Sequence, residues 1–275
     1  MDFERCAGSF ENIGSVIRHI SVVSSTMDLA WEMARGDAPD GTVIIADEQS
    51  AGRGRYERSW ISAGAEDILC SIVLKPRLSL VPELLMLAAL GCVDVAENYG
   101  LTTGIKWPND VQINGRKLAG VIAESITGLG SPDDTDDSSV CISGSESTGV
   151  IAVIGIGLNV NLNPMDHTEI SGGSTSLRVE LHRTVDRAEV FGILIDSIDR
   201  HYSYLLSGGT VLPAWRERLT TLGREVTVVH GSPGCSAVLN GLAVDVDSAG
   251  RLIVRDPNHR DWPVSSGEVT IREIK

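Results

Sequence analysis

The sequence lacks the patterns that mark several common classes of protein. Its five cysteines are scattered with no C-x-x-C pair, and its six histidines show no metal-ligand spacing, so no zinc site is predicted. It contains no run of 18 or more apolar residues, and its N-terminus has no charged-then-apolar secretion signal. The cysteines are therefore expected to be buried, reduced thiols in a cytoplasmic protein without membrane contact.

Positive charge is also scarce. The chain has 23 Lys and Arg residues against 37 Asp and Glu residues, which gives a formal net charge of −14. Nonspecific nucleic-acid binding is excluded, because it requires a basic surface that displaces counterions from phosphates. A single anionic small molecule stays compatible with this charge, since a few local cations are enough to bind it.

The 275 residues and a hydrophobic content of 42% are sufficient for one large domain, or for one large and one small domain. Strand and helix patterns alternate without a strict βαβ period, which predicts an α/β or α+β catalytic domain. Strands are expected at 13–23, 41–49, 67–76 and 150–163, and helices at 27–37, 81–100 and 186–206.

The style of the sequence changes after about Leu222, where short strands alternate with glycines and turns. This pattern is typical of a small β-barrel module. Another segment, Thr127 to Gly149, is rich in Asp, Ser and Gly and is expected to be a mobile acidic loop between two strands. A tolerated surface insertion and a segment that docks a partner are both compatible with its composition.

The segment "GIKWPNDVQINGRKLAGVIAE", residues 104–124, carries two lysines in an apolar, turn-rich context. Asn114-Gly115 predicts a two-residue type I′ hairpin turn. That turn pairs Ile113 with Arg116, Gln112 with Lys117, and Val111 with Leu118. The alternation of side chains then gives the hairpin two faces. The apolar face consists of Val111, Ile113, Leu118, Gly120 and Ile122. The opposite face consists of Asp110, Gln112, Lys117, Ala119 and Val121.

Lys117 therefore leaves the core face together with Asp110. Two interpretations are open from this stretch alone: a solvated face with a cross-strand ion pair, or a site that faces a ligand.

The segment "EQSAGRGRYERSW", residues 48–60, places Arg53, Arg55 and Arg58 beside Gly52 and Gly54. Glycine lets a backbone approach a ligand closely, and guanidinium groups bind phosphate or carboxylate through two hydrogen bonds. The segment is interpreted as an anion-binding flap that orders on ligand binding, although it matches neither a P-loop nor a dinucleotide fingerprint. A basic, flexible surface loop is the alternative.

The segment "IGIGLNVN", residues 154–161, has Gly155 and Gly157 within an expected strand. Such glycines indicate a bulge or a close approach of a ligand, and Asn159 offers an amide for hydrogen bonding. A core strand with a glycine kink explains this segment nearly as well.

In this order, and together with "SST" at Ser24–Thr26, "TSL" at Thr175–Leu177 and the terminal "GEVTIREI", these motifs resemble the biotin protein ligases. The resemblance runs from Ser24 to the C-terminus. It implies an α+β fold with a mixed-sheet catalytic domain of the biotin/lipoate ligase type over residues 1–221, with 127–149 as its mobile loop. A small SH3-like β-barrel is implied for residues 222–275.

The resemblance also implies a two-step reaction. The biotin carboxylate attacks the α-phosphate of ATP, which gives biotinyl-5′-AMP and pyrophosphate. A lysine of a biotin carboxyl carrier protein domain then attacks the adenylate, and AMP leaves. Fixed cations stabilise the charge that develops in both steps, and Mg²⁺ is implied as a companion of ATP, bound by Asp110 directly or through water.

Carried over residue by residue, the resemblance gives three overlapping groups of site residues. The catalytic group is Lys117, Arg53, Arg55 and Lys106. The biotin pocket is Ser25, Thr26, Gln49, Gly52, Arg53, Lys117 and Gly120. The ATP and adenylate group is Arg55, Lys106, Asn109, Asp110, Gly155, Gly157 and Asn159. Met27 stands where the family often has asparagine, so a polar contact is missing at that position.

The "SST" motif begins at residue 24, which leaves no room for the N-terminal helix-turn-helix domain of the family's repressors. A ligase that does not bind DNA is therefore expected. A lipoate or octanoate ligase or transferase and a non-catalytic biotin-binding protein are the alternatives. The sequence leaves open whether the chain acts alone or as a homodimer, and which carrier protein it modifies.

Overall fold

The computed structural model describes residues 3, 10–55, 59–62, 64–127, 149–232, 235–265 and 268–271. Arg58 of the predicted flap lies outside the described residues, as does almost all of the predicted acidic loop, residues 128–148.

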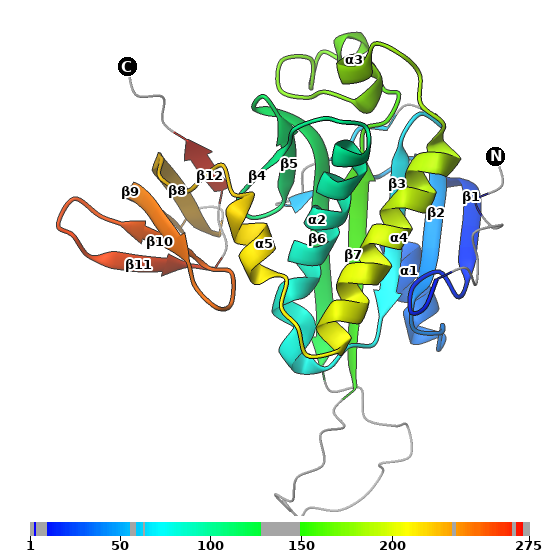
Figure 1. Ribbon diagram of the computed structural model, residues 1–275, viewed down its shortest axis with the longest axis horizontal. Coiled ribbons are helices and arrows are strands. Elements are labelled where there is room, and N and C mark those ends of the chain that lie inside the picture. The colour runs from blue at the N-terminus through cyan, green and yellow to red at the C-terminus, as the bar shows by residue number, and fades with distance from the viewer. Residues whose placement is uncertain are drawn as a thin grey trace, which may run out of the picture.

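A seven-stranded mixed sheet forms the centre of the fold (Figure 1), with strand order β1-β2-β3-β7-β6-β5-β4. The first pair, β1 and β2, runs parallel, and the other neighbouring pairs run antiparallel. The strands are β1 (Ile17–Val23), β2 (Thr42–Gln49), β3 (Ile68–Leu74), β4 (Gly104–Lys106), β5 (Asp110–Ile113), β6 (Arg116–Thr127) and β7 (Val150–Leu158). This mixed sheet confirms the α+β expectation.

Helices cover both faces of the sheet (Figure 1). On one face, α2 and α4 pack against each other, and α1 lies on the opposite face against β2, β3 and β7. The helices are α1 (Thr26–Arg35), α2 (Val81–Asn98), α3 (Leu177–Leu181), α4 (Arg187–Leu206) and α5 (Leu212–Glu217). The three long helices confirm the predicted ones, whereas α3 and α5 were not predicted because each is too short for a periodic apolar pattern.

Local sequence explains where α4 begins and which face it buries. Asp186 precedes the helix, and its carboxylate accepts hydrogen bonds from the amides of Ala188 and Glu189. Val190 and Leu194 recur at helical spacing and are fully buried against α2 and the sheet.

One helix among the described residues, Leu78–Asn98, is long and apolar enough by length and composition to cross a membrane, with a mean hydropathy of 1.9. About half of this segment, 56%, is buried inside the protein, where α2 packs on α4 and on the sheet. The core helix of a globular protein meets the same criteria, so this segment is weak evidence for a membrane span.

A second, five-stranded antiparallel sheet follows, with strand order β11-β10-β9-β8-β12. Its strands are β8 (Glu225–Ser232), β9 (Cys235–Val246), β10 (Leu252–Arg255), β11 (Asp261–Val264) and β12 (Glu268–Ile271). It lies beside α5 and β4 (Figure 1), and the Trp107 indole nitrogen donates to the Gly250 carbonyl at 2.9 Å. The antiparallel strands agree with the sequence, whereas closure into an SH3-like barrel and the domain boundary at 221/222 stay predictions.

The hairpin between β5 and β6 corrects one prediction. Asn114 and Gly115 both have positive φ, as a type I′ turn requires, and the pairs Ile113–Arg116 and Gln112–Lys117 form as predicted. Val111, however, pairs with Ala119, so Leu118 is the extra residue of a β-bulge.

The bulge shifts the alternation of β6 by one residue. Ala119 and Val121 are therefore fully buried in the core, although the sequence predicted them on the opposite face. Gly120 and Ile122, predicted on the core face, line a pocket instead. Lys117 precedes the bulge and keeps its predicted orientation away from the core, next to Asp110.

A buried polar network joins the start of α4 to the neighbouring strands. Arg187 is 2% exposed, and its side chain donates to the Asp67 carbonyl at 2.9 Å and to the Asp47 carboxylate at 3.0 Å. The Asp67 carboxylate accepts from the amides of Val160 and Leu162. The network holds the ends of β2, β3 and β7 at a fixed spacing.

Burial raises the pKa of the Asp67 carboxyl to about 6, although two backbone amides stabilise its ionised form. Because the folded pKa lies above the unfolded value, ionisation opposes folding, and the stability that the neutral form provides is lost as the pH rises from about 4 to 6. By pH 7 this cost is about 3 kcal/mol. We expect an Asp67→Asn variant, measured by urea unfolding, to gain stability relative to the wild type between pH 4 and pH 7.

Asp37→Asn is the control for this measurement. The hydrogen bond and charge of Lys75 lower the pKa of the Asp37 carboxyl below its ordinary value, so its contribution to stability is lost only as the pH falls below about 4, and the stability of that variant relative to the wild type should stay nearly constant between pH 4 and pH 7. A stability difference between Asp67→Asn and the wild type that stays constant over this pH range would contradict the interpretation.

Candidate active site

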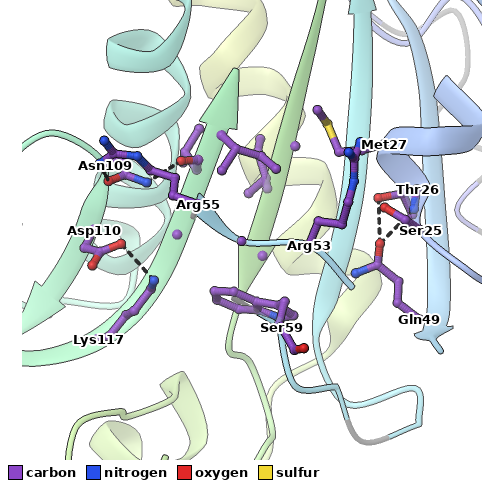
Figure 2. Close-up of a pocket in the computed structure, with 18 of the residues that line it drawn as sticks. Ser25, Thr26, Met27, Gln49, Arg53, Arg55, Ser59, Asn109, Asp110 and Lys117 are labelled. Carbon is purple, nitrogen blue, oxygen red and sulfur yellow. Dashed lines mark hydrogen bonds and ion pairs between the residues drawn. The ribbon is translucent and has the colours of Figure 1, made fainter. Parts of the chain in front are cut away.

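A pocket of about 190 Å³ lies between the flap, α1 and the strands β5, β6 and β7 (Figure 2). It brings together most of the residues that the sequence predicted for the site. Those that line it are Ser25, Thr26, Gln49, Arg53, Arg55, Lys106, Asn109, Asp110, Lys117, Gly120, Gly155 and Gly157.

One side of the pocket is formed by the end of β2 and the start of α1 (Figure 2). The Gln49 amide oxygen accepts from the Thr26 backbone amide at 2.8 Å and from its hydroxyl at 3.0 Å, so Gln49 caps the first turn of α1. The Ser25 hydroxyl is buried with no hydrogen-bond partner among the described residues. An unsatisfied hydroxyl in the wall of a pocket indicates a position where a ligand supplies the partner.

The opposite side carries positive charge (Figure 2). The Lys117 ammonium lies 2.8 Å from an Asp110 oxygen, and the Arg55 guanidinium donates to the Asn109 amide oxygen at 3.1 Å. Lys106, the last residue of β4, lies opposite Asp110 in the backbone pairing of β4 and β5. The turn between them contains the Trp107-Pro108 peptide bond, which is cis.

The charge of this pocket differs in sign from that of the whole chain. Among the described residues, its lining includes four basic side chains and a single carboxylate, in a protein of net charge −14. An anion is therefore attracted to this pocket and repelled by most of the remaining surface.

Two predicted residues do not line the pocket. The Asn159 side chain is buried behind the wall and donates to the backbone carbonyls of Thr175 at 2.9 Å and Lys117 at 3.4 Å. Its backbone amide donates to the Leu118 carbonyl, so Asn159 supports the bulge that follows Lys117. The structure therefore does not place Asn159 in the lining of this pocket, and its position beside the adenylate stays a prediction. Gly52 lies in the neighbouring cleft, where it forms the base of the flap.

Trp60 also lines the pocket, although no role was predicted for it from the sequence. Its ring lies over the paired glycines Gly120 and Gly157, and a Cβ added at Gly157 would lie 2.4 Å from the indole. The Lys117 ammonium lies 5.2 Å from the centre of the ring. An aromatic residue at the end of a glycine- and arginine-rich segment was the signal available in the sequence.

Gly155 and Met27 form a second close contact. A Cβ at Gly155 would lie 2.7 Å from the Met27 sulfur, and Met27 is 2% exposed. Both glycines of β7 thus leave space for the side chain of a pocket residue, Met27 or Trp60, and the predicted close approach of a ligand to these glycines stays a prediction.

The pocket supplies too few ligands to hold a metal ion by itself, and it fits one only together with a bound phosphate group. Within the part of the chain that the structure describes, Asp110 supplies the one carboxylate of the lining, and no group of three or more His, Cys, Asp or Glu residues could hold a metal. Mg²⁺ commonly keeps several waters and uses one or two carboxylates plus phosphate oxygens, and Asp110 can meet that requirement.

Residues 19–132 match the family model described as the biotin/lipoate A/B protein ligase family. The chain is 33% identical over 273 residues to the biotin–[acetyl-CoA-carboxylase] ligase of Mycobacterium tuberculosis. The matched region covers 93% of this chain and 90% of that protein. The chain belongs to the biotin protein ligase family. It is therefore a ligase, and biotin ligation is the activity that its family supports.

Other relatives agree with this assignment. The bifunctional ligase/repressor BirA of Bacillus subtilis is 32% identical over 89% of this chain and 70% of its own length. The solved biotin protein ligase from Aquifex aeolicus, in complex with biotin and ATP, superposes with a TM-score of 0.73 over 94% of this chain and 99% of that chain. At 22% identity this second likeness shows a shared fold.

Proposed function

We propose that the chain is an ATP-dependent biotin protein ligase. In the first step a biotin carboxylate oxygen bonds to the α-phosphorus of ATP, the bond to the bridging oxygen breaks, and pyrophosphate leaves. In the second step the amine of a carrier-protein lysine attacks the acyl carbon of biotinyl-5′-AMP. The acyl carbon–oxygen bond breaks, AMP leaves with the electron pair, and the amine loses a proton.

The observation that carries this proposal is the convergence of four basic side chains on one pocket of an acidic protein. Both steps pass through a crowded anionic centre, and fixed cations in a partly enclosed site stabilise developing negative charge. The Aquifex aeolicus relative was solved in complex with biotin and ATP, which supports the same two substrates here.

We assign the central role to Lys117. Its ammonium would bind the biotin carboxylate and then the phosphate that this carboxylate joins. Its pairing with Asp110 at 2.8 Å orients it, and the hydrogen bonds around the bulge fix its backbone. Lys106 and Arg55 would contact the ATP phosphates from the same side, and Asn109 would orient Arg55 through their hydrogen bond of 3.1 Å.

The other side of the pocket would hold the vitamin. Ser25 and Gln49 offer hydroxyl and amide groups that suit the polar ureido ring. Met27, Trp60 and Ile122 form an apolar wall for the thiophane ring and the valeryl chain. Mg²⁺ would arrive with ATP and interact with Asp110 directly or through water, where its charge would offset that of the phosphates.

The partner we propose is a biotin carboxyl carrier protein domain, in keeping with the biotin–[acetyl-CoA-carboxylase] ligases among the relatives. We also propose that the chain is a ligase without a repressor role, because its charge of −14 opposes contact with phosphate backbones. A cytoplasmic location fits the free, buried thiols of Cys70 and Cys92.

The decisive experiment measures pyrophosphate release from ATP in the presence of biotin or lipoate. We expect pyrophosphate release from ATP with biotin and not with lipoate. Isothermal titration should show binding of biotin and of ATP to the same chain. Release with lipoate alone would replace the proposal by lipoate ligation, and biotin binding without any release would leave a binding protein. A mobility shift with a biotin operator sequence would contradict the absence of a repressor role.

A further inference from the structure

Arg53 lies at a junction of three cavities. It lines the active-site pocket, a larger cleft toward α2 and the C-terminal sheet, and a third cleft along α1. Figure 2 shows its side chain on the α1 side of the pocket, near Met27 and away from Lys117. The position of this guanidinium therefore decides how the pocket is closed toward α1.

Two carboxylates hold the guanidinium there. The Arg53 Nη2 atom lies 2.9 Å from an Asp28 oxygen and 3.8 Å from a Glu124 oxygen. The first acid comes from the opening turn of α1 and the second from β6, so the two walls of the cleft meet at one arginine.

The acidic partners are themselves anchored. The Glu124 oxygen that faces Arg53 also accepts from the Trp31 indole nitrogen at 2.7 Å, and Trp31 is buried in the cluster beneath α1. Asp28 belongs to the first turn of α1, where a carboxylate is favoured by the helix dipole. The pair of acids is thus a fixed receptor for a side chain that the flap carries.

Arg53 also belongs to the base of the flap. Its backbone forms a bridge with Ser59, and the Trp60 amide donates to the Gly52 carbonyl at 2.9 Å. The ion pairs of the Arg53 side chain therefore also restrain the base of the flap relative to α1 and β6.

We propose that Asp28 and Glu124 form an acidic clamp that positions Arg53 and retains the reaction intermediate in the pocket. This inference rests on the proposed function, since the intermediate is biotinyl-5′-AMP. Both ion pairs use Nη2, and a guanidinium has five N–H groups on two edges, so one edge is anchored while another meets an anionic ligand. Asp28 and Glu124 are positioning residues that act through Arg53.

The size of the effect follows from exposure. The side chains of Arg53, Asp28 and Glu124 are 41%, 52% and 44% exposed, so the ion pairs are weakened by water and by salt. Loss of the clamp should therefore increase escape of the intermediate about two- to fivefold, without unfolding the protein.

The test uses the full chain with labelled biotin and ATP and without a carrier protein, and measures the rate at which biotinyl-5′-AMP appears in solution. Asp28→Asn and Glu124→Gln keep the shape of each side chain and remove its charge, and glutamine can still accept from Trp31. Both variants should release the intermediate about two- to fivefold faster than the wild type, and Asp28→Glu should restore part of the retention. Asp37→Asn, which removes a similar ion pair of 2.9 Å with Lys75 near the other end of α1, should match the wild type.

Ionic strength supplies a second readout that a structural role would not change. Raising salt from about 0.05 M to 0.5 M should speed release from both proteins, because salt also screens the contacts between the anionic intermediate and the basic side chains, but the ratio of the Asp28→Asn rate to the wild-type rate should fall toward 1. Release at wild-type rates by Asp28→Asn, or slower release, would overturn the clamp. A wild type that makes no adenylate at all would instead overturn the proposed function, so the two failures are distinguishable.

Discussion

A Lys117→Ala variant should lose about 100- to 1,000-fold of the biotin-dependent release of pyrophosphate. The ammonium is the cation in this pocket that lies between the paired glycines, the indole of Trp60 and the carboxylate of Asp110. Its removal would leave the developing charge of the first step without its nearest fixed cation. The measurement is the rate of pyrophosphate release at saturating biotin and ATP.

Thermal unfolding of the same variant should stay close to the wild type, because the Lys117 side chain is 32% exposed and contributes little to the core. Lys75→Ala is the control for loss of a lysine, since Lys75 pairs with the exposed Asp37 at 2.9 Å and lies outside the lining of the pocket. Near-normal turnover by Lys117→Ala would reject the role assigned to this residue.

An Arg187→Met variant should lose about 3 kcal/mol of the free energy of unfolding. Arg187 is 2% exposed, and its guanidinium binds the Asp47 carboxylate, the Asp67 carbonyl and the face of Phe3. Methionine fills a similar volume but leaves both oxygens without this donor in a buried setting. Because Asp47 lies just before Gln49 in β2, biotin affinity should fall as well. Urea unfolding and biotin titration measure the two effects.

Arg200→Met is the matched control on the same helix. Arg200 is 61% exposed and pairs with Asp196 at 3.2 Å, so its replacement should change the free energy of unfolding by less than about 0.5 kcal/mol. Equal destabilisation by the two substitutions would show that burial of the Arg187 network is not the source of its stability.

The periodic and turn-forming segments of the fold were predictable from sequence. Asn114-Gly115 predicted the hairpin, and the apolar spacing of 186–206 predicted α4. Most pocket residues were also predicted, through the resemblance of the glycine, arginine and lysine motifs to those of the biotin protein ligases.

The bulge at Leu118 was not predictable from its own segment. It depends on hydrogen bonds from Asn159, which follows β7 and is distant in sequence. The same holds for the clamp on Arg53, since Asp28 and Glu124 are ordinary surface acids until α1 and β6 lie on either side of the flap. Periodicity describes one element, whereas these features arise where several elements meet.

The extra residue at Leu118 gives β6 a change of phase in mid-strand. Residues before it and after it follow opposite inside–outside rules, so one strand can serve the active site with Lys117 and the core with Ala119. If an alignment of homologous chains places a gap at this position, every residue that follows on the strand is assigned to the wrong face of the sheet. The count of residues between Lys117 and Gly120 is therefore as strict a requirement as their identities.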